Sequence, residues 1–142
     1  MIQHQVSVHI NRPMEQVFAF VADAKNLRTW QSNLVENEQL TEEPARVGTR
    51  FREVRRTGPR QSEIQAEITV FEPHKHFATR TLTGPQVTVS YDFEDENGGT
   101  RLTYKFVMIT SGFMRLLEPL ISGSMKKDSN LDFEKLKHVL EH

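Results

Sequence analysis

Segments with the pattern of β-strands follow one another through most of this sequence, and this run of strands is the strongest constraint on its fold. They cover residues 6–10, 47–56, 64–70, 77–83, 87–93 and 102–108. The pattern is clearest between Ile64 and Val70, where apolar and polar residues alternate with the period of two that is typical of a half-buried strand. Short turns such as Asn97–Gly99 separate the later segments. Strands joined by short turns pair antiparallel, so the sequence predicts an antiparallel sheet.

Helical patterns precede and follow the main run of strands. Asn11 is a candidate N-cap and Pro13 suits a first helical turn, so a short helix is expected after the first strand. Residues 23–30 predict a second short helix. Over residues 113–138, apolar residues recur at helical spacing, which predicts a C-terminal helix roughly 40 Å long. Pro119 either kinks this helix or marks its true start.

These elements predict one α+β domain in which a curved antiparallel sheet of about seven strands surrounds the C-terminal helix. The sheet has one apolar face to cover, and only the C-terminal helix is long enough to cover it. Because one helix does not fill the space inside a curled sheet, the remaining volume predicts a cavity. Residues 140–142 look like the start of an affinity tag, so the domain is expected to cover residues 1–139.

The composition argues against several functional classes. The formal net charge of -1 gives no general attraction to nucleic acid or to anionic membranes. The absence of cysteine excludes disulfides, thiolate catalysis and cysteine-ligated zinc. No apolar run approaches the ~20 residues that span a bilayer, and no secretory leader is evident. We therefore expect a cytoplasmic protein without stable membrane insertion, nucleic-acid partner or cofactor.

Several short motifs resemble those of a known superfamily. Residues 10–18, followed by Asp23 and Trp30, resemble the opening of the START-related superfamily (SRPBCC), and the polyketide cyclase/dehydrase-like group is the most similar within it. Further matches follow in family order at residues 47–49, 71–73, 98–103 and 136–137. The resemblance implies the helix-grip fold, which the birch pollen allergen family shares. It does not imply one function, because the superfamily includes lipid carriers, aromatic polyketide cyclases, coenzyme Q-binding proteins and co-chaperone relatives.

The residues expected on the inner surface are mostly large, soft or aromatic, as in pockets that bind small molecules. The candidate ligand-binding residues are Trp30, Phe51, Phe77, Thr79, Val89, Tyr91, Tyr104, Phe106, Met108, Met114, Leu117, Ile121 and Met125. The alternative for each of them is simple packing in the core. Tyr91 and Tyr104 are the main polar candidates, because a buried hydroxyl needs a partner from the protein or from a ligand.

An arginine-rich strand supplies the candidate catalytic residues. If Phe51 faces the cavity, then Glu53 and Arg55 face it too, whereas an inward Val54 would bring Arg52 and Arg56 inside. An inward Glu53 could act as a base, and Arg55 could orient or polarise a carbonyl group. The alternative is a solvated strand face balanced by nearby glutamates. No aromatic stacking platform accompanies the arginines, which argues against RNA binding.

The histidines do not predict a metal site. His74 and His76 would share one face of a strand, but zinc needs three or four ligands and the sequence offers no third. His4 has the same parity as Val6 and is expected to face inward. A solvated or hydrogen-bonded histidine is the alternative for each.

Three functions are consistent with these observations. The first, which we favour, is binding or transport of a hydrophobic small molecule such as a lipid, a quinone or a polyketide-like aromatic. The second is a cyclase/dehydrase-type enzyme, which needs an inward acid–base pair. The third is a protein-interaction module of the co-chaperone type, which needs an exposed apolar patch at the mouth of the pocket. The sequence specifies neither the ligand nor the oligomeric state.

Overall fold

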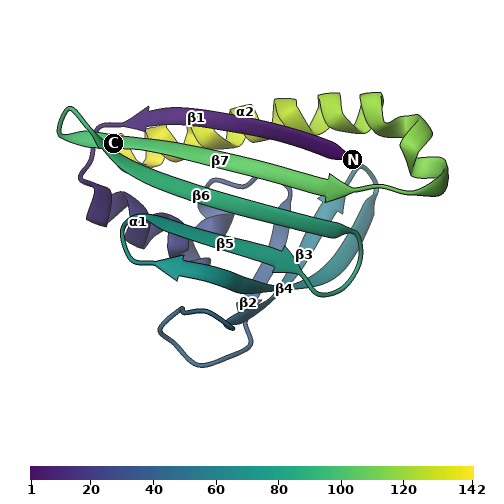
Figure 1. The fold of residues 1–142 in the computed structure, drawn as a ribbon, viewed down its shortest axis with the longest axis horizontal. Helices are drawn as coiled ribbons and strands as arrows, with labels where there is room; N and C mark the ends of the chain where they lie inside the picture. The colour runs from purple at the N-terminus through teal and green to yellow at the C-terminus, as the bar shows by residue number, and fades with distance from the viewer.

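A seven-stranded antiparallel sheet curves around one long C-terminal helix in a computed structural model of the protein (Figure 1). The structure describes residues 1–142 apart from the side chain of Thr57. The strands are β1 (Ile2–Ile10), β2 (Leu34–Gln39), β3 (Arg50–Thr57), β4 (Arg60–Glu72), β5 (His76–Thr81), β6 (Gln86–Glu96) and β7 (Gly99–Ile109). The helices are α1 (Met14–Ala22), the 3-10 helix η1 (Ala24–Thr29), the 3-10 helix η2 (Gly112–Leu117) and α2 (Glu118–Glu141).

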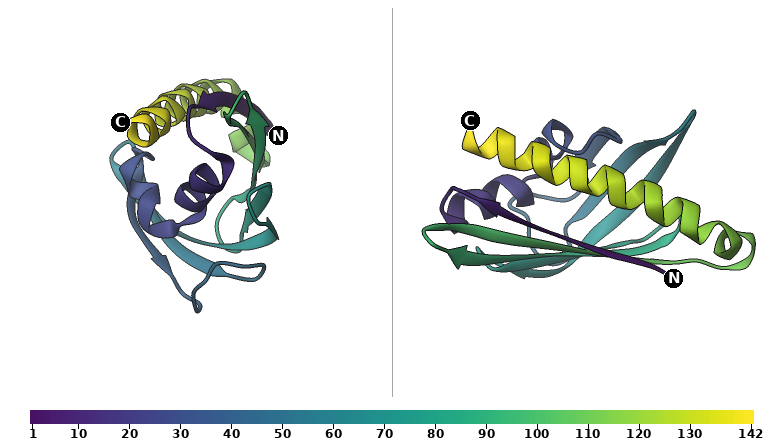
Figure 2. Two further views of the ribbon diagram at one scale, coloured as in Figure 1. Left: turned by 90° about the vertical axis from the view of Figure 1, so that its left-hand side faces the viewer. Right: turned by 90° about the horizontal axis from the view of Figure 1, so that it is seen from above.

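The strand order is β1-β7-β6-β5-β4-β3-β2. Strands β2 to β7 therefore form a meander of consecutive neighbours, and β1 pairs with β7 from Ile2 opposite Met108 to Ile10 opposite Thr100. Figure 2 shows the sheet curling below α2, with α1 and η1 lying across one end of the curl. The predicted α+β helix-grip fold is confirmed.

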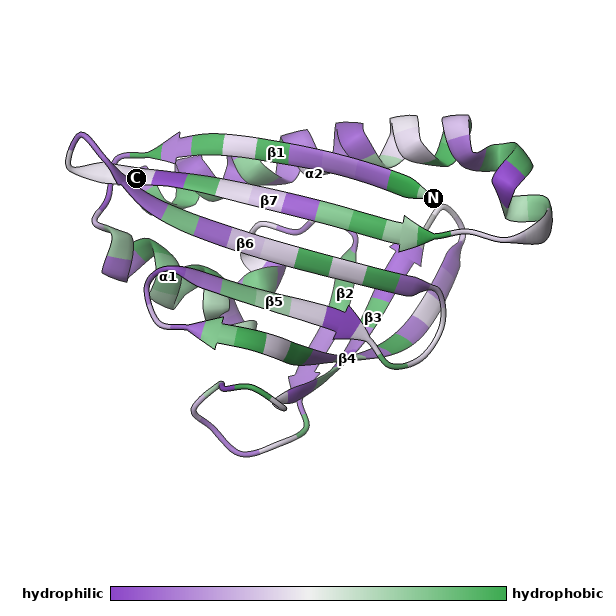
Figure 3. Cartoon of the chain, viewed as in Figure 1, coloured by the Kyte–Doolittle hydropathy of each residue, from purple (hydrophilic) through white to green (hydrophobic). Residues whose placement is uncertain are grey.

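Hydropathy alternates along the strands, as the sequence analysis expects (Figure 3). On β6, the inward Tyr91 and Phe93 are buried, whereas Asp92 between them is only partly buried. The alternation is harder to see in β2, which the sequence analysis does not identify. This strand is six residues long, and its pairing with β3 shifts register between Leu34 and Glu36. Residues 36–39 are all polar, so this strand shows no apolar–polar alternation on which a prediction could rest.

The two short helices after β1 are confirmed, but the cap of the first one differs from the prediction. Pro13, rather than Asn11, occupies the N-cap position of α1. Asp23 caps η1 by accepting a hydrogen bond from the backbone N–H of Lys25 at 3.0 Å. The buried face of α1, which includes Val17 and Phe18, packs against the sheet.

Of the two predictions for Pro119, the structure confirms that this residue marks the start of the long helix rather than a kink within it. The preceding residues form η2, so α2 has 24 residues and is about 36 Å long. Its buried face consists of Phe133, Leu136 and Leu140. The Glu141 carboxylate accepts a hydrogen bond from the backbone N–H of Asn11 at 2.7 Å. Residues 140 and 141 therefore belong to the packed structure, and their origin from a tag stays a prediction.

The packed core lies at the end of the fold that α1 and η1 cover. Phe18 of α1 makes edge-on contacts with Phe77 and Phe93 of the sheet, at ring-centroid distances of 5.7 and 5.1 Å. Trp30 packs on Phe133 of α2 at 5.0 Å. Among the described residues, no corresponding helix fills the space between α2 and the sheet beyond this point, and a cavity begins there.

Candidate ligand-binding cavity

A cavity of about 260 Å³ lies between the concave face of the sheet and α2. This volume lies just below the usual range for small-molecule pockets. The helices α1 and η1 supply one end of the lining, including Val21 and Leu27. Strands β3 to β7 supply one wall and α2 the other.

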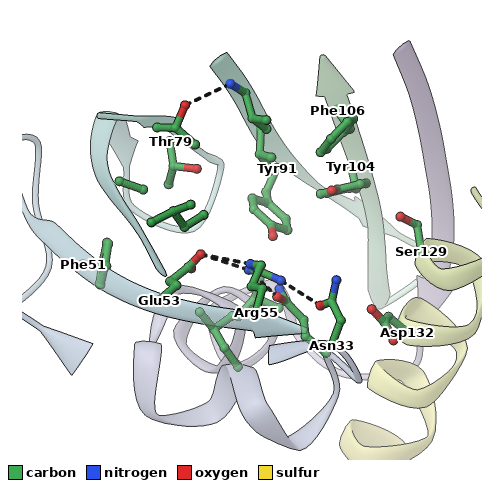
Figure 4. Close-up of a pocket in the computed structure, with 18 of the residues that line it drawn as sticks. Asn33, Phe51, Glu53, Arg55, Thr79, Tyr91, Tyr104, Phe106, Ser129 and Asp132 are labelled. Carbon is green, nitrogen blue, oxygen red and sulfur yellow. Dashed lines mark hydrogen bonds and ion pairs between the residues drawn. The ribbon is translucent and has the colours of Figure 1, made fainter. Parts of the chain in front are cut away.

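Most of the residues predicted to bind a ligand line this cavity. They are Trp30, Phe51, Phe77, Thr79, Val89, Tyr91, Tyr104, Phe106 and Met125. Figure 4 shows labelled residues of this group pointing into one space from different strands. Their role in binding stays a prediction.

The remaining predicted residues do not line the cavity. Met108 is buried, but it lies near the end of β7, where it is opposite Ile2. Met114 is 37% exposed and belongs with Leu117 to η2, while Ile121 lies in the first turn of α2. The prediction treats residues 113–138 as one continuous helix with one inner face. The 3-10 turn before Pro119 breaks that periodicity, so Met114 and Leu117 do not share the face of Met125. Ile121 lies one turn before Met125 on α2, beyond the end of the lining.

The cavity-facing side of β3 carries Phe51, Glu53 and Arg55, all of which line the cavity. Of the two predicted parities, the structure thus has the one in which Phe51 faces inward. Arg52 lies on the other face, where it forms ion pairs with Glu36 at 3.3 Å and Glu63 at 2.7 Å. Pairing explains the parity, because Phe51 is opposite the buried Ala66 of β4.

Arg55 is the centre of a polar cluster in the cavity wall (Figure 4). Its Nε donates to Glu53 Oε2 at 3.1 Å, its Nη1 to Asn33 Oδ1 at 2.9 Å and its Nη2 to Gln31 Oε1 at 2.9 Å. Burial disfavours the guanidinium cation, but the charge and hydrogen bond of Glu53 outweigh burial and raise the pKa of Arg55. The guanidinium therefore stays charged, and the loop before β2 is tied to β3.

Two tyrosines of β6 and β7 face this cluster across the cavity, from another part of the curled sheet. The rings of Tyr91 and Tyr104 lie 5.3 Å apart on neighbouring strands, and Figure 4 shows the Tyr91 hydroxyl directed toward Arg55. Burial raises the pKa of Tyr91 well above its usual value, and the neighbouring Tyr104 adds to the effect. Burial also raises the pKa of Tyr104, against the opposing effect of the Arg55 charge. Both hydroxyls are therefore neutral donors at physiological pH.

His4 lines the cavity, as its parity predicts. Its Nε2 lies 3.0 Å from Ser129 Oγ, and its ring stacks on Phe106 at 4.8 Å. Burial lowers the pKa of His4, and the positive charge of Lys126 lowers it further. Buried polar atoms without a hydrogen-bond partner among the described residues are His4 Nδ1 and Trp30 Nε1. Such atoms cost stability unless water or a ligand pairs with them.

The sequence analysis does not identify several polar residues that line the cavity: Gln31, Asn33, Asp128, Ser129 and Asp132. Gln31 and Asn33 lie in an irregular segment between η1 and β2, where no periodicity indicates an inner face. The α2 residues do carry a signal. Ser129 follows Met125 by four positions and Asp132 follows it by seven, which places them on one helix face.

Asp132 connects α2 to the loop before β2. Its Oδ1 accepts hydrogen bonds from the Ser32 backbone N–H at 3.2 Å and from Ser32 Oγ at 2.9 Å. Burial nevertheless raises the pKa of Asp132 above its usual value. The contact holds the loop that carries Gln31 and Asn33 against the helix, so the cavity wall on this side depends on α2.

The other predicted histidines lie outside the cavity. His76 Nδ1 is 2.7 Å from Asp92 Oδ1, and His74 occupies a positive-φ position with φ of 69°. Among the described residues, no group of three or more histidine and acidic side chains is arranged to hold a metal ion. None of the helices in the described chain is long and apolar enough to cross a membrane.

Comparison with known proteins identifies a sequence family and several similar folds. Residues 1–141 match the family described as polyketide cyclase / dehydrase and lipid transport. A crystal structure of a protein from Thermus thermophilus has a TM-score of 0.83 at 18% identity, covering 96% of this chain and 94% of that chain. No curated protein matches the chain.

Two further solved structures are similar. Ara h 8.0201 has a TM-score of 0.74 at 12% identity, covering 97% of this chain and 96% of that chain. The di-domain ARO/CYC BexL from the BE-7585A biosynthetic pathway has a TM-score of 0.76 at 18% identity, covering 99% of this chain and 50% of that chain. Identities this low show a shared fold alone. The family match over nearly the whole sequence shows that the chain belongs to the polyketide cyclase/dehydrase and lipid transport family.

Proposed function

We propose that this protein binds a hydrophobic small molecule, such as a lipid, a quinone or a polyketide-like aromatic, in the cavity between the sheet and α2. The observation that carries the proposal is the combination of an apolar lining with a polar cluster on one wall. Aromatic and aliphatic residues such as Phe51, Phe77 and Val89 supply most of the surface, and Arg55 and the two tyrosines supply hydrogen bonds. Ligand pockets typically have this composition.

Binding, rather than catalysis, fits the hydrogen bonds of the polar cluster. The Arg55 guanidinium is already paired with Glu53, Asn33 and Gln31 before any ligand enters. A preorganised cluster of this kind holds the cavity wall in one shape and offers hydrogen bonds at fixed positions. Because such positions orient a ligand without transferring a proton, they support a carrier or receptor function.

A cavity-filling variant tests the proposal. Val89 lines the cavity on β6, whereas the adjacent Thr88 is exposed on the other face of the same strand. We expect Val89→Trp to abolish binding of small aromatic and aliphatic probes in isothermal titration calorimetry, because the indole would occupy the cavity. Thr88→Trp adds the same ring outside and should bind like the wild type. Equal binding by the two variants would contradict the proposal.

Native mass spectrometry offers a second measurement on the same variants. Protein purified under mild conditions should carry an additional mass from a retained hydrophobic molecule. That mass should be present in the wild type and in Thr88→Trp and absent from Val89→Trp. Retention by Val89→Trp would place the bound molecule elsewhere on the protein.

A cyclase/dehydrase-type reaction is the second candidate, and the inward position of Glu53 favours it. The side chain of Glu53 is only 13% exposed and lies beside Arg55, with Tyr91 across the cavity on β6. A carboxylate base near a carbon acid, together with donors to a carbonyl oxygen, is what such a reaction requires. NMR can follow hydrogen–deuterium exchange at the carbon between two carbonyls of a 1,3-diketone. Catalysis predicts exchange that Glu53→Gln removes, whereas binding alone leaves the buffer rate unchanged.

The third candidate, a protein-interaction module, requires an exposed apolar patch at the mouth of the pocket. Phe113, Leu116 and Leu120 are 73%, 76% and 75% exposed around the start of α2. They lie outside the cavity lining, at the end of the molecule opposite the C-terminus (Figure 1). The candidate predicts a protein partner that wild-type protein captures from lysate and that Leu116→Glu loses. Capture of no specific partner would argue against it.

A further inference from the structure

The charges that border the cavity indicate which ligands it accepts. The charged lining residues are Glu53, Arg55, Arg80, Asp128 and Asp132. The Arg80 side chain is 58% exposed, and its guanidinium pairs with Glu67, which is not part of the lining, at 2.6 Å. Arg55 is therefore the one cation within the described lining that lies inside, and it is paired with Glu53. Burial also leaves His4 neutral, so the cavity holds no uncompensated positive charge.

The hydrogen bonds of Arg55 also leave its guanidinium poorly placed to bind an anionic ligand. A guanidinium recognises a carboxylate or phosphate through two parallel N–H bonds along one edge. Glu53 occupies the edge formed by Nε and Nη2, with both nitrogens 3.1 Å from Oε2. The edge formed by Nη1 and Nη2 donates to the amide oxygens of Asn33 and Gln31, each at 2.9 Å. An anionic ligand would have to displace one of these partners and approach the Glu53 carboxylate.

The groups that remain suit a neutral ligand. Glu53 Oε1 accepts no hydrogen bond from the described residues, whereas Oε2 accepts the bond from Arg55. A hydroxyl group on a ligand could donate to Oε1 without adding charge to the cavity. The Tyr91 hydroxyl faces the same cluster, and Trp30 Nε1 is a buried donor without a partner among the described residues. These donors suit oxygen acceptors elsewhere on the ligand.

We propose that Glu53 makes the cavity selective for uncharged hydrophobic ligands that carry a hydroxyl donor, and that it excludes carboxylates and phosphates. This inference rests on the proposed binding function and names the ligand class. Glu53 acts in two ways: it compensates the charge of Arg55 and it accepts the hydrogen bond of the ligand. Removing its charge should free the Arg55 cation and shift the preference toward anions.

Calorimetric titration of three matched probes tests this proposal. 2-Naphthol is a neutral donor, 2-naphthoate is an anion, and 2-methoxynaphthalene is neutral but cannot donate. At pH 7.5 the wild type should bind 2-naphthol at least about tenfold more tightly than either of the others. Glu53→Gln should lower the ratio of 2-naphthol affinity to 2-naphthoate affinity by about tenfold, so that the two affinities become similar or change order. Glu63→Gln is the control, because Glu63 pairs with Arg52 on the outer face of the sheet and should leave the ratios unchanged.

The outcomes separate this inference from the proposed function. If wild-type protein binds 2-naphthoate as tightly as 2-naphthol, the selectivity proposal is wrong and the binding function stands. The binding function itself is wrong if two results occur together. The wild type binds none of the three probes, and wild type and Val89→Trp bind longer aliphatic alcohols equally. Should Glu53→Gln fail to fold by circular dichroism, the three wild-type affinities decide the matter. A preference for the donor-free 2-methoxynaphthalene over 2-naphthol would overturn the role of Glu53 as acceptor.

Discussion

Glu53 and Arg55 lie two residues apart on β3, and Arg55 Nε donates to Glu53 Oε2 at 3.1 Å on the cavity side of the strand. Their side chains are 13% and 26% exposed, so the pair is largely shielded from bulk water. A pair in this position contributes through compensation of charge more than through net attraction. Its loss should therefore affect stability and ligand preference together.

Removing only one member of this pair should destabilise the fold. Arg55→Met leaves Glu53 without its counter-charge and breaks the hydrogen bonds to Asn33 and Gln31. We expect a loss of about 3 kcal/mol, at the low end of the range for broken buried pairs because Arg55 is partly exposed. Urea unfolding measures the loss. The double variant Glu53→Gln/Arg55→Met should recover part of the lost stability. If Arg55→Met is as stable as the wild type, the pair does not stabilise the fold.

The packing between α2 and the sheet can be tested on two leucines of the same helix. Leu136 is 0% exposed, whereas Leu131 is 55% exposed. Leu136→Ala should lower the free energy of unfolding by about 2–5 kcal/mol, because it removes buried methyl groups and leaves a cavity. Leu131→Ala should change it by no more than about 0.5 kcal/mol. Similar losses in thermal or urea unfolding would show that α2 presents a different face to the sheet.

Two glycines should respond in opposite directions to the same substitution. Apart from its chain neighbours and the backbone of its own helix, an alanine Cβ at Gly123 in α2 meets no atom of the described residues within 4 Å. Gly123→Ala should therefore stabilise the helix by up to about 1 kcal/mol. At Gly99 the Cβ would lie 2.7 Å from the carbonyl oxygen of Ile10 and 2.9 Å from the His9 ring. Gly99→Ala should therefore cost about 1–3 kcal/mol. Differential scanning calorimetry distinguishes the two, and destabilisation by Gly123→Ala would argue against the open surroundings of that position.

The sequence contains two tyrosines, and both face the cavity, so the absorbance of phenolate reports on the cavity alone. Burial raises the pKa of Tyr91 and of Tyr104. In the folded state, little phenolate absorbance should appear near 295 nm as the pH passes the ordinary tyrosine pKa of about 10, whereas urea-unfolded protein should titrate there. Titration of native protein near the ordinary value would show that the hydroxyls are open to solvent.

The same shifts determine how stability depends on pH. Because the folded-state pKa values are raised, the contribution of the neutral tyrosines is complete below the ordinary pKa and is lost as the pH rises above it toward the folded values. The free energy of unfolding should therefore fall above about pH 10. Tyr104→Phe should reduce this alkaline loss. An unchanged slope in that variant would assign the loss to other groups.

The architecture follows from local patterns along the chain. The alternation in residues 64–70, 87–93 and 102–108 depends only on neighbours in the sequence, and it predicts strands that the structure contains. The change to helical spacing predicts the long helix in the same way, although its start at Glu118 depends on the 3-10 turn before it. The strand β2 is missed because its last four residues, 36–39, are all polar and show no apolar–polar alternation.

The polar side of the cavity could not be predicted in the same way. The alternation in β3 defines two faces, but it does not say which face is inside until Phe51 is seen opposite the buried Ala66. Asn33 and Gln31 reach Arg55 from positions 22 and 24 residues earlier in the chain. Because those two residues lie in an irregular segment, no periodicity links them to β3.

By itself, the sequence determined that strands form an antiparallel sheet, that a long helix follows them, and that residues such as Tyr91 and Tyr104 share the apolar parity. These properties are local, since the backbone geometry of a strand or a helix sets which neighbours share a face. Only the tertiary structure decided that Glu53 and Arg55 face inward and that Gln31, Asn33 and Asp132 complete the cavity wall. Those contacts join distant segments, and they depend on strand pairing and on the position of α2 against the sheet, which no local pattern encodes.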